Sequence, residues 1–536
     1  MSAATLISRI LGYIKDMILA GYFGASAKSD VFFVAFRIPN LLRELFAEGS
    51  MSAAFVPVLT ETQTKEGREA ANRLVRAVLA VVLLVVGAVC ILGIIFAPVI
   101  VSLIAPGFVH EPVKFADAVL LTRIMFPFLL FISLASLAMG ALNTRGVFFI
   151  PALAPALLNV VTIVCIVTLA SQFANPIIAV AIGIALGGLV QFLFQVPAFW
   201  RQGFTFFRSE KAGERSQESG GQNPAKDASR LTPHASPLFS HPGLRRIGTL
   251  VIPATFGMAV AQINIFVSTI LASYLSDGSI TYLYYSMRLI QFPIGIFGVA
   301  MGMAILPALS EHAAKKELGL LKEDFSFALR LLFFITVPAM AGLIALQMPI
   351  VNTLFQRGEF THAASINTAQ ALMYYAVGIW AIVGVRTITS TFYAMQDTKT
   401  PVKIAACGVI INVIASVALM GPMQHNGLAL ANSIAAAVNF LLLFYFLRDK
   451  LGGIGTKRIV RSFAKTCAAA AVMGIAGWVA TRSELWTTSG QAGLKAIFLS
   501  GAVCGSIGLY LAVSYVLKSE ELLYLTKKIH ERFRGR

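Results

Sequence analysis

Residues 29–59 read "SDVFFVAFRIPNLLRELFAEGSMSAAFVPVL", and the stretch from Val31 to Leu59 is apolar enough to cross a membrane. A helix that spans a bilayer needs about 20 mostly apolar residues. This stretch nevertheless carries four charged side chains, Arg37, Arg43, Glu44 and Glu48. An ionised group inside a bilayer costs at least roughly 2.5–3.5 kcal/mol, so such groups usually face a partner or a watery cavity. The stretch therefore predicts a membrane helix whose polar side has a function beyond spanning.

The composition of the whole chain indicates an all-α polytopic membrane protein. Hydrophobic residues make up 57% and charged residues 13%, with a mean hydropathy of +0.77, which excludes a soluble globule. The long unbroken apolar runs favour helices over a barrel of short alternating strands. We expect about fourteen spans, near residues 3–24, 31–59, 77–104, 117–142, 150–171, 175–200, 247–275, 281–309, 325–354, 366–394, 401–420, 427–447, 459–481 and 493–517.

The distribution of charge predicts the orientation of the chain. The first run contains Arg9, Lys15 and Asp16 and has no small-residue cleavage site, so it indicates a retained first helix and not a signal peptide. Lys and Arg collect in alternate loops, and this pattern places both termini in the cytoplasm. The net charge of +18 then reflects topology and attraction to anionic lipid, and a nucleic-acid partner is not expected.

Motifs for catalysis or metal binding are not found in the sequence. The five cysteines lie singly in apolar spans, and the seven histidines fall in loops or the tail. Neither a phosphate-binding G-x-x-x-x-G-K-[ST] loop nor a G-x-S-x-G elbow occurs. We therefore expect no enzymatic activity, no catalytic residues, no metal site and no cofactor.

An internal repeat predicts the domain organisation. The segment "FVPVLTE" ending at Glu61 resembles "ILPALSE" ending at Glu311, and Pro151 corresponds to Pro401. Such parallel repeats flank a central pathway in transporters. We expect a first six-helix repeat at 1–200, a disordered basic cytoplasmic linker at 201–246, a second six-helix repeat at 247–448, two extra helices at 459–517 and a basic cytoplasmic tail at 518–536.

The charges of the first repeat are mostly absent from the second. Arg9, Lys15, Asp16, Arg43 and Glu48 all correspond to apolar residues 251 positions later, and only Arg37 has a charged counterpart, Arg288. Two explanations stay open. The charges form mutually satisfied structural pairs, or they line a cationic cavity for an anionic cargo. Cations outnumber acids here, which favours a cavity in which guanidinium groups bind phosphate. The isolated Arg386 is expected to be structural.

Several segments resemble the MurJ (MviN) family of lipid II flippases. They are "SRILGYIKD", "SDVFFVAFRIPNLLRELFAEGSMSAAFVPVL", "APGF", "FISLASLAMGALNTRGVFFIPALAPALLN", "YYSMRLIQFPIGIFGVA" and "QDTKTPVKIA". The resemblance implies a non-enzymatic flippase of the MOP superfamily that moves the undecaprenyl-diphosphate-linked peptidoglycan precursor across the bacterial inner membrane by alternating access. It also implies that 459–517 forms a groove for the lipid tail.

The resemblance further implies a set of cavity residues. The essential cations of the family fall on Arg9, Arg43 and Arg288, and a further family arginine corresponds to Lys15. The expected supporting polar residues are Asp16, Asp30, Arg37, Asn40, Glu48 and Gln291. Met287 and Gln291 stand where some relatives carry acidic residues. The implied partners are lipid II, membrane lipids and the machinery of peptidoglycan synthesis, elongation and division.

Two rival functions and the energy source stay open. A flippase for another undecaprenyl-diphosphate-linked glycan, such as an O-antigen unit, would share the cationic chemistry, whereas a MATE-like multidrug exporter should have carboxylates in its cavity. Coupling to the membrane potential is favoured, since one charge is worth about 2.3 kcal/mol per 100 mV. The amides of Asn264, Asn412, Asn432 and Asn439 could instead supply oxygens for sodium.

Overall fold

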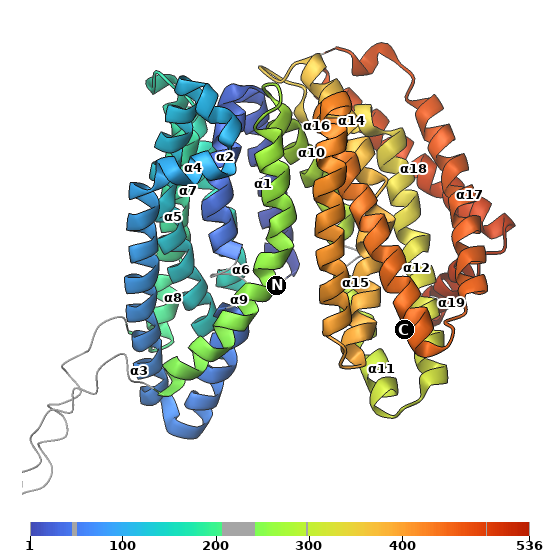
Figure 1. Cartoon of the computed structure of the whole chain (residues 1–536), viewed down its shortest axis with the longest axis horizontal. Coiled ribbons are helices and arrows are strands. Elements are labelled where there is room, and N and C mark those ends of the chain that lie inside the picture. The colour runs from blue at the N-terminus through green and yellow to red at the C-terminus, as the bar shows by residue number, and fades with distance from the viewer. Residues whose placement is uncertain (1, 45–50, 206–241, 296–298, 489, 535–536) are drawn as a thin grey trace, which may run out of the picture. The chain divides into compact units, whose positions relative to one another are not determined.

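The computed structural model describes residues 2–44, 51–205, 242–295, 299–488 and 490–534. Within these residues the chain forms α-helices and short 3₁₀ helices, and no strand occurs among them (Figure 1). The chain divides into two compact units, the first comprising Met1–Leu19 and Val31–Ile263 and the second Ala20–Asp30 and Asn264–Arg536. Each unit is described by itself below.

The first unit is built around the long helix α5. Helices α3 and α7 pack against α5, and α6 packs against α7. Gly93 of α3 allows a close approach to α5, because a Cβ at this position would lie 2.0 Å from the ring of Phe126. In chain order the helices are α1 (Ser2–Phe23), α2 (Ala27–Leu42), α3 (Met51–Ile95), α4 (Ala97–Ile104), η2 (Pro106–His110), α5 (Pro112–Thr144), α6 (Phe149–Leu169), η3 (Ala170–Gln172), α7 (Ile178–Leu193), α8 (Val196–Arg201) and α9 (Pro242–Ala272). The end of α1, the start of α2 and the end of α9 belong to the second unit.

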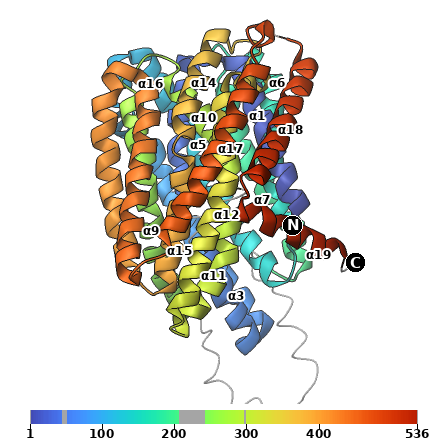
Figure 2. The same ribbon diagram turned by 90° about the vertical axis from the view of Figure 1, so that its right-hand side faces the viewer.

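The second unit is centred on α12, which contacts α15, α17 and α14. Figure 2 shows α12, α17 and α18 side by side. Its further helices are α10 (Ser279–Pro293), α11 (Val299–Ala314), α12 (Leu318–Ala345), α13 (Gln347–Phe355), α14 (His362–Ala376), α15 (Ile379–Ala394), α16 (Lys399–Leu451), α17 (Thr456–Ala480), η7 (Glu484–Trp486), α18 (Ala492–Val516) and α19 (Glu520–Arg534). The tail expected at 518–536 thus contains a helix, α19.

The helix bounds recur about 250 residues apart. Helix α5 (Pro112–Thr144) corresponds to α14 and α15, which together run from His362 to Ala394, and α4 corresponds to α13. The backbone breaks at Gly67 (φ 88°) and at Lys316 (φ 59°), so both units have a short helix before the break and a long helix after it. The expected domain boundaries at residues 200 and 247 stay a prediction, and most of the linker, residues 206–241, lies outside the described residues.

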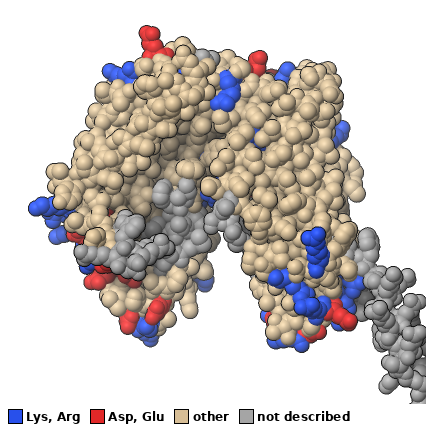
Figure 3. Space-filling model, turned by 180° about the vertical axis from the view of Figure 1, so that it is seen from behind, with Lys and Arg blue, Asp and Glu red and all other residues tan. Residues whose placement is uncertain are grey.

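The structure confirms a multi-pass membrane protein. In the described ranges, nine helical stretches are long and apolar enough to span a bilayer: Ala54–Ile95, Pro112–Thr144, Phe149–Gln172, Ile178–Arg201, Leu318–Ala345, His362–Ala394, Lys399–Leu451, Thr456–Ala480 and Ala492–Val516. Lys399–Leu451 bends at Gln424 and covers two of the expected spans. On the face shown in Figure 3, most charged side chains lie toward the top and the bottom of the view, and mainly uncharged surface lies between them. The count of fourteen stays a prediction.

Candidate functional site

The three charged residues of α1 lie in different environments. Asp16 is buried, and its Oδ1 lies 3.4 Å from Nζ of the half-buried Lys15. Arg9, nearly two turns earlier, is exposed and forms no ion pair within the described part of the chain. Asp16 therefore compensates Lys15, its neighbour in sequence, and Arg9 provides a cation that no described carboxylate neutralises.

A polar cluster lies at the end of α2. Nε of Arg43 donates to Oδ1 of Asn40 at 3.2 Å, and Nδ2 of Asn40 donates to Oε1 of Glu44 at 3.2 Å. Gln262 of α9 donates to the other oxygen of Glu44. The Arg43 side chain remains 24% accessible. The amide of Asn40 thus orients the guanidinium of Arg43 without burying it.

The helix that carries Arg43 has an irregular turn at this residue. Residues 43–44 form a π-helical turn that begins four residues after Pro39, and residues 294–295 form another directly after Pro293. Single π-helical turns inside helices occur mostly at functional sites. Each proline lacks the N–H that would bond the carbonyl four residues earlier, so one helical hydrogen bond is missing shortly before each π-helical turn. Glu48 lies outside the described residues.

Asp30 holds the N-terminus of α10. Its carboxylate accepts hydrogen bonds from the N–H of Gly278 at 2.7 Å, the N–H of Thr281 at 2.9 Å and the hydroxyl of Thr281 at 2.7 Å. The residue is 2% exposed. Gly278 has a φ of 89°, a conformation that favours glycine. Asp30 therefore caps and anchors the helix that carries Arg288.

Packing against α14 fixes the remainder of α10. The Ser286 hydroxyl donates to the carbonyl of Tyr282 on its own helix and to that of Thr368 on α14. Arg288 and Met287 are half-buried, and Gln291 is exposed. Arg288 thus lies on a helix that is held at its start by Asp30 and along its length by α14.

The structure brings only some of the expected site residues together. The α2 cluster joins Asn40 and Arg43, and α1 joins Lys15 and Asp16. The half-buried Arg37 lies on α2 between the two groups in sequence. These residues belong to the first unit, whereas Asp30, Arg288 and Gln291 belong to the second. A common cationic cavity stays a prediction.

Sequence reasoning missed a buried ion-pair network. Arg330 of α12 is 4% exposed, and its Nη1 lies 2.8 Å from Oε2 of Glu520 and 2.8 Å from Oε1 of Glu521, both on α19. Arg458 of α17 lies 2.6 Å from Glu520. The sequence does show an arginine, Arg330, inside an expected membrane span. Its carboxylate partners could not be identified from the sequence, because they lie about 190 residues later in the chain. This network fixes α19 against α12 and α17.

The comparisons with known proteins identify the family. A sequence model of the family described as lipid II flippase MurJ matches residues 19–497. The chain belongs to this family. A probable lipid II flippase MurJ from Vibrio cholerae serotype O1 is 35% identical over 527 residues, covering 96% of this chain and 95% of the relative. The lipid II flippase MurJ of Burkholderia cenocepacia is 35% identical over 488 residues, covering 91% of this chain and 90% of that one.

The fold of the chain is also similar to that of a solved MurJ structure. A lipid II flippase MurJ in an inward closed conformation is 27% identical, with a TM-score of 0.74, and the match covers 96% of this chain and 98% of the other. An inward-facing MATE family multidrug transporter of the MOP superfamily is 16% identical, with a TM-score of 0.63 over 83% of this chain and 94% of that one. The second likeness shows a shared fold alone.

Proposed function

We propose that this MurJ family member is a lipid II flippase, which moves the undecaprenyl-diphosphate-linked disaccharide-pentapeptide from the cytoplasmic to the periplasmic leaflet for cell wall synthesis. The observation that carries the proposal is the family match, which extends over residues 19–497 and includes the polar cluster of α2. A transporter of this kind makes and breaks no covalent bond in its cargo, so its residues act by binding and release.

The diphosphate of the cargo is held by cations of α1, α2 and α10. Arg9, Arg43 and Arg288 supply planar guanidinium forks, which match phosphate oxygens bidentately, and Lys15 supplies a point charge. Asn40 orients Arg43 through the 3.2 Å hydrogen bond to Nε, which leaves the outer edge of the fork directed to the ligand. Asp30 acts indirectly, because it fixes the helix that carries Arg288.

The cellular setting follows from the proposed cargo. The protein lies in the bacterial inner membrane with both termini in the cytoplasm, where the basic loops remain. Lipid II and membrane lipids are its immediate partners, and enzymes of peptidoglycan synthesis, elongation and division consume the product. The transport cycle is alternating access, in which the cargo shifts the populations of two conformations by binding them unequally.

Complementation of a strain depleted of its own flippase tests this function. The wild-type chain should restore growth, Arg43→Ala should not, and Arg43→Lys should restore it in part, because lysine keeps the charge and loses the fork. The abundance of each variant in the membrane is measured in parallel. Full growth with Arg43→Ala at normal abundance would contradict the assignment of Arg43, and failure of the wild-type chain would contradict the function.

A further inference from the structure

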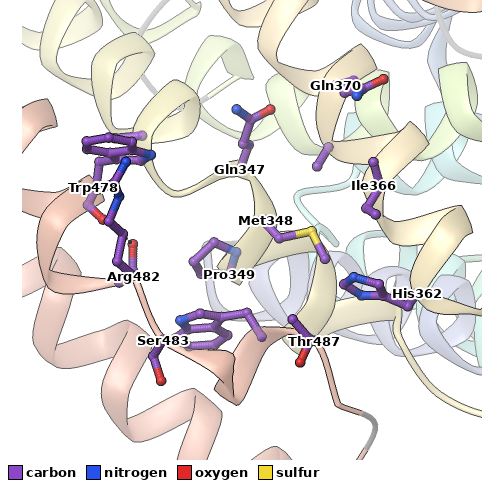
Figure 4. Close-up of a pocket in the computed structure, with 14 residues that line it drawn as sticks. Gln347, Met348, Pro349, His362, Ile366, Gln370, Trp478, Arg482, Ser483 and Thr487 are labelled. Carbon is purple, nitrogen blue, oxygen red and sulfur yellow. Dashed lines mark hydrogen bonds between the residues drawn. The ribbon is translucent and has the colours of Figure 1, made fainter.

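A pocket of about 410 Å³ lies within the second unit, between α13, α14 and the end of α17 (Figure 4). Met348, Pro349 and Ile366 form an apolar part of its lining. Arg482, Ser483 and Thr487 form a polar part. The pocket thus presents hydrogen-bond donors beside an apolar surface.

Arg482 is the charged residue of this pocket. Its guanidinium lies 3.5 Å from the ring centroid of Trp478, and Figure 4 shows the two side chains together on one side of the pocket. The residue is exposed, and no carboxylate of the described chain lies within ion-pair distance of it. Stacking on an indole occupies the face of the guanidinium and leaves the N–H groups on its edge, where they can bind an anion.

Several hydrogen bonds hold the segment that follows Arg482. Nδ2 of Asn352 donates to the carbonyl of Trp486 at 2.7 Å, and Nε2 of Gln356 donates to that of Thr487 at 3.1 Å. Nζ of Lys495, which is 2% exposed, donates to Oδ1 of Asn352 at 2.8 Å. Lys495 Nζ also donates to the carbonyl of Thr488, so these buried hydrogen bonds fix the segment that carries Trp486 and Thr487.

The pocket also holds a buried donor without a partner. Trp486 is 5% exposed, and its Nε1 makes no hydrogen bond within the described chain. A buried donor left without a partner costs about 1–3 kcal/mol. The Arg482 guanidinium and this indole N–H therefore favour a ligand with acceptor oxygens and negative charge.

Exposed apolar side chains of α17 lie next to the pocket in sequence. Val472, Ile475 and Val479 are 46%, 63% and 57% exposed, and their spacing places them on one face of α17, just before Arg482. Helix α17 is long and apolar enough to span a membrane. An apolar strip that ends at an exposed, stacked arginine matches a phospholipid, because the acyl chain can lie along the strip while the phosphate lies at the arginine.

We propose that this pocket binds the phosphate headgroup of an anionic phospholipid, with Arg482 as its charged ligand and the exposed face of α17 as the support for an acyl chain. The pocket has no lining residue in α1, α2 or α10, and the proposal does not depend on the proposed transport function. In the proposed orientation the pocket opens toward the periplasm.

Native mass spectrometry of the full-length protein tests the proposal, with phosphatidylglycerol and phosphatidylcholine as probes. The wild type should retain phosphatidylglycerol over phosphatidylcholine, and Arg482→Gln should lower that preference roughly five- to tenfold, since a charge-assisted phosphate contact is lost. The matched control is Arg461→Gln, which removes an exposed arginine near the opposite end of α17. Equal loss in both variants, or no preference in the wild type, would overturn the proposal.

Two further measurements distinguish the role of the charge of Arg482 from that of its planar stack, and a lipid headgroup from free phosphate. Arg482→Lys keeps the charge and loses the planar stack, so its preference for phosphatidylglycerol should lie between those of the wild type and Arg482→Gln; this variant also serves if Arg482→Gln does not fold. Inorganic phosphate alone should raise the Tm less than phosphatidylglycerol does. If inorganic phosphate protects equally and no lipid is retained, the site takes free phosphate and the lipid assignment is wrong.

Discussion

Replacement of Asp30 by alanine should destabilise the second unit strongly. The carboxylate accepts three hydrogen bonds of 2.7–2.9 Å in a site that is 2% exposed. Its loss leaves two backbone N–H groups and one hydroxyl without this acceptor, and each unsatisfied buried donor costs about 1–3 kcal/mol. Such costs are not additive, so we expect a total of about 3–5 kcal/mol. Asp30→Asn keeps one acceptor oxygen and should cost about 2 kcal/mol.

Thermal unfolding of the detergent-purified protein measures this loss. Three of the four tryptophans, Trp380, Trp478 and Trp486, lie in the second unit, so intrinsic fluorescence reports mainly on that unit. A change of 1 kcal/mol shifts Tm by about 2–4 °C for domains of 150–250 residues, which predicts a decrease of roughly 10 °C for Asp30→Ala.

The control for Asp30→Ala is Asp277→Ala, which removes an exposed carboxylate next to Gly278. Exposed substitutions usually change stability by less than 0.5 kcal/mol, roughly. Asp277→Ala should therefore leave Tm within about 2 °C of the wild type. Equal Tm values for Asp30→Ala and Asp277→Ala would refute the anchoring role of Asp30.

Four further predictions concern topology, linker, pH and energy. In a cysteine-free background, cysteines introduced at the exposed positions Ser276 and Gln424 should react with an impermeant thiol reagent added from the periplasm. A cysteine at Ser219 should not react, and the reverse pattern would contradict the predicted orientation. Deletion of about 25 residues between positions 210 and 240 should leave growth intact, because closing a flexible gap costs little entropy, and lost growth at normal abundance would assign the linker a role. Lys450 at 2.6 Å and the N–H of Thr400 lower the pKa of Asp397 from 3.8 to about 2. The ion pair should therefore stabilise the fold fully above pH 3.8, and this stabilisation should be lost only as the pH falls toward about 2. A Tm difference between the wild type and Asp397→Asn that disappears near pH 6 would contradict this prediction. An imposed membrane potential should accelerate flipping in liposomes, whereas acceleration by a sodium gradient alone would favour sodium coupling.

The sequence predicted the fold class because the signal is local. Apolar runs of about 20 residues identify membrane helices directly, and the 250-residue repeat follows from "FVPVLTE" and "ILPALSE". The charged helix α1 does not appear among the nine apolar stretches, since Arg9, Lys15 and Asp16 lower its hydropathy. The polar residues that mark a site thus weaken the pattern by which the helix is recognised.

The partners of the charged residues could not be predicted from the sequence. The sequence did not show which charges of α1 form pairs, and in the structure Asp16 forms an ion pair with Lys15, its neighbour in sequence. Asp30 was expected among the cavity polar residues, and it caps a helix that begins about 250 residues later. The partners of Arg330 are similarly distant. Contacts of this kind depend on tertiary packing, which leaves no periodic signal in the sequence.

The most direct test of the cationic site is lipid II flipping by the purified protein in liposomes. Labelled lipid II is placed in one leaflet, and its appearance in the other is followed for the wild type, for Arg9→Ala, Arg43→Ala and Arg288→Ala, and for Arg386→Ala as a control. We predict flipping by the wild type and by Arg386→Ala, and little above protein-free liposomes for the other three variants at equal reconstitution. Wild-type rates in Arg9→Ala, Arg43→Ala and Arg288→Ala would contradict the role of these arginines in holding the diphosphate.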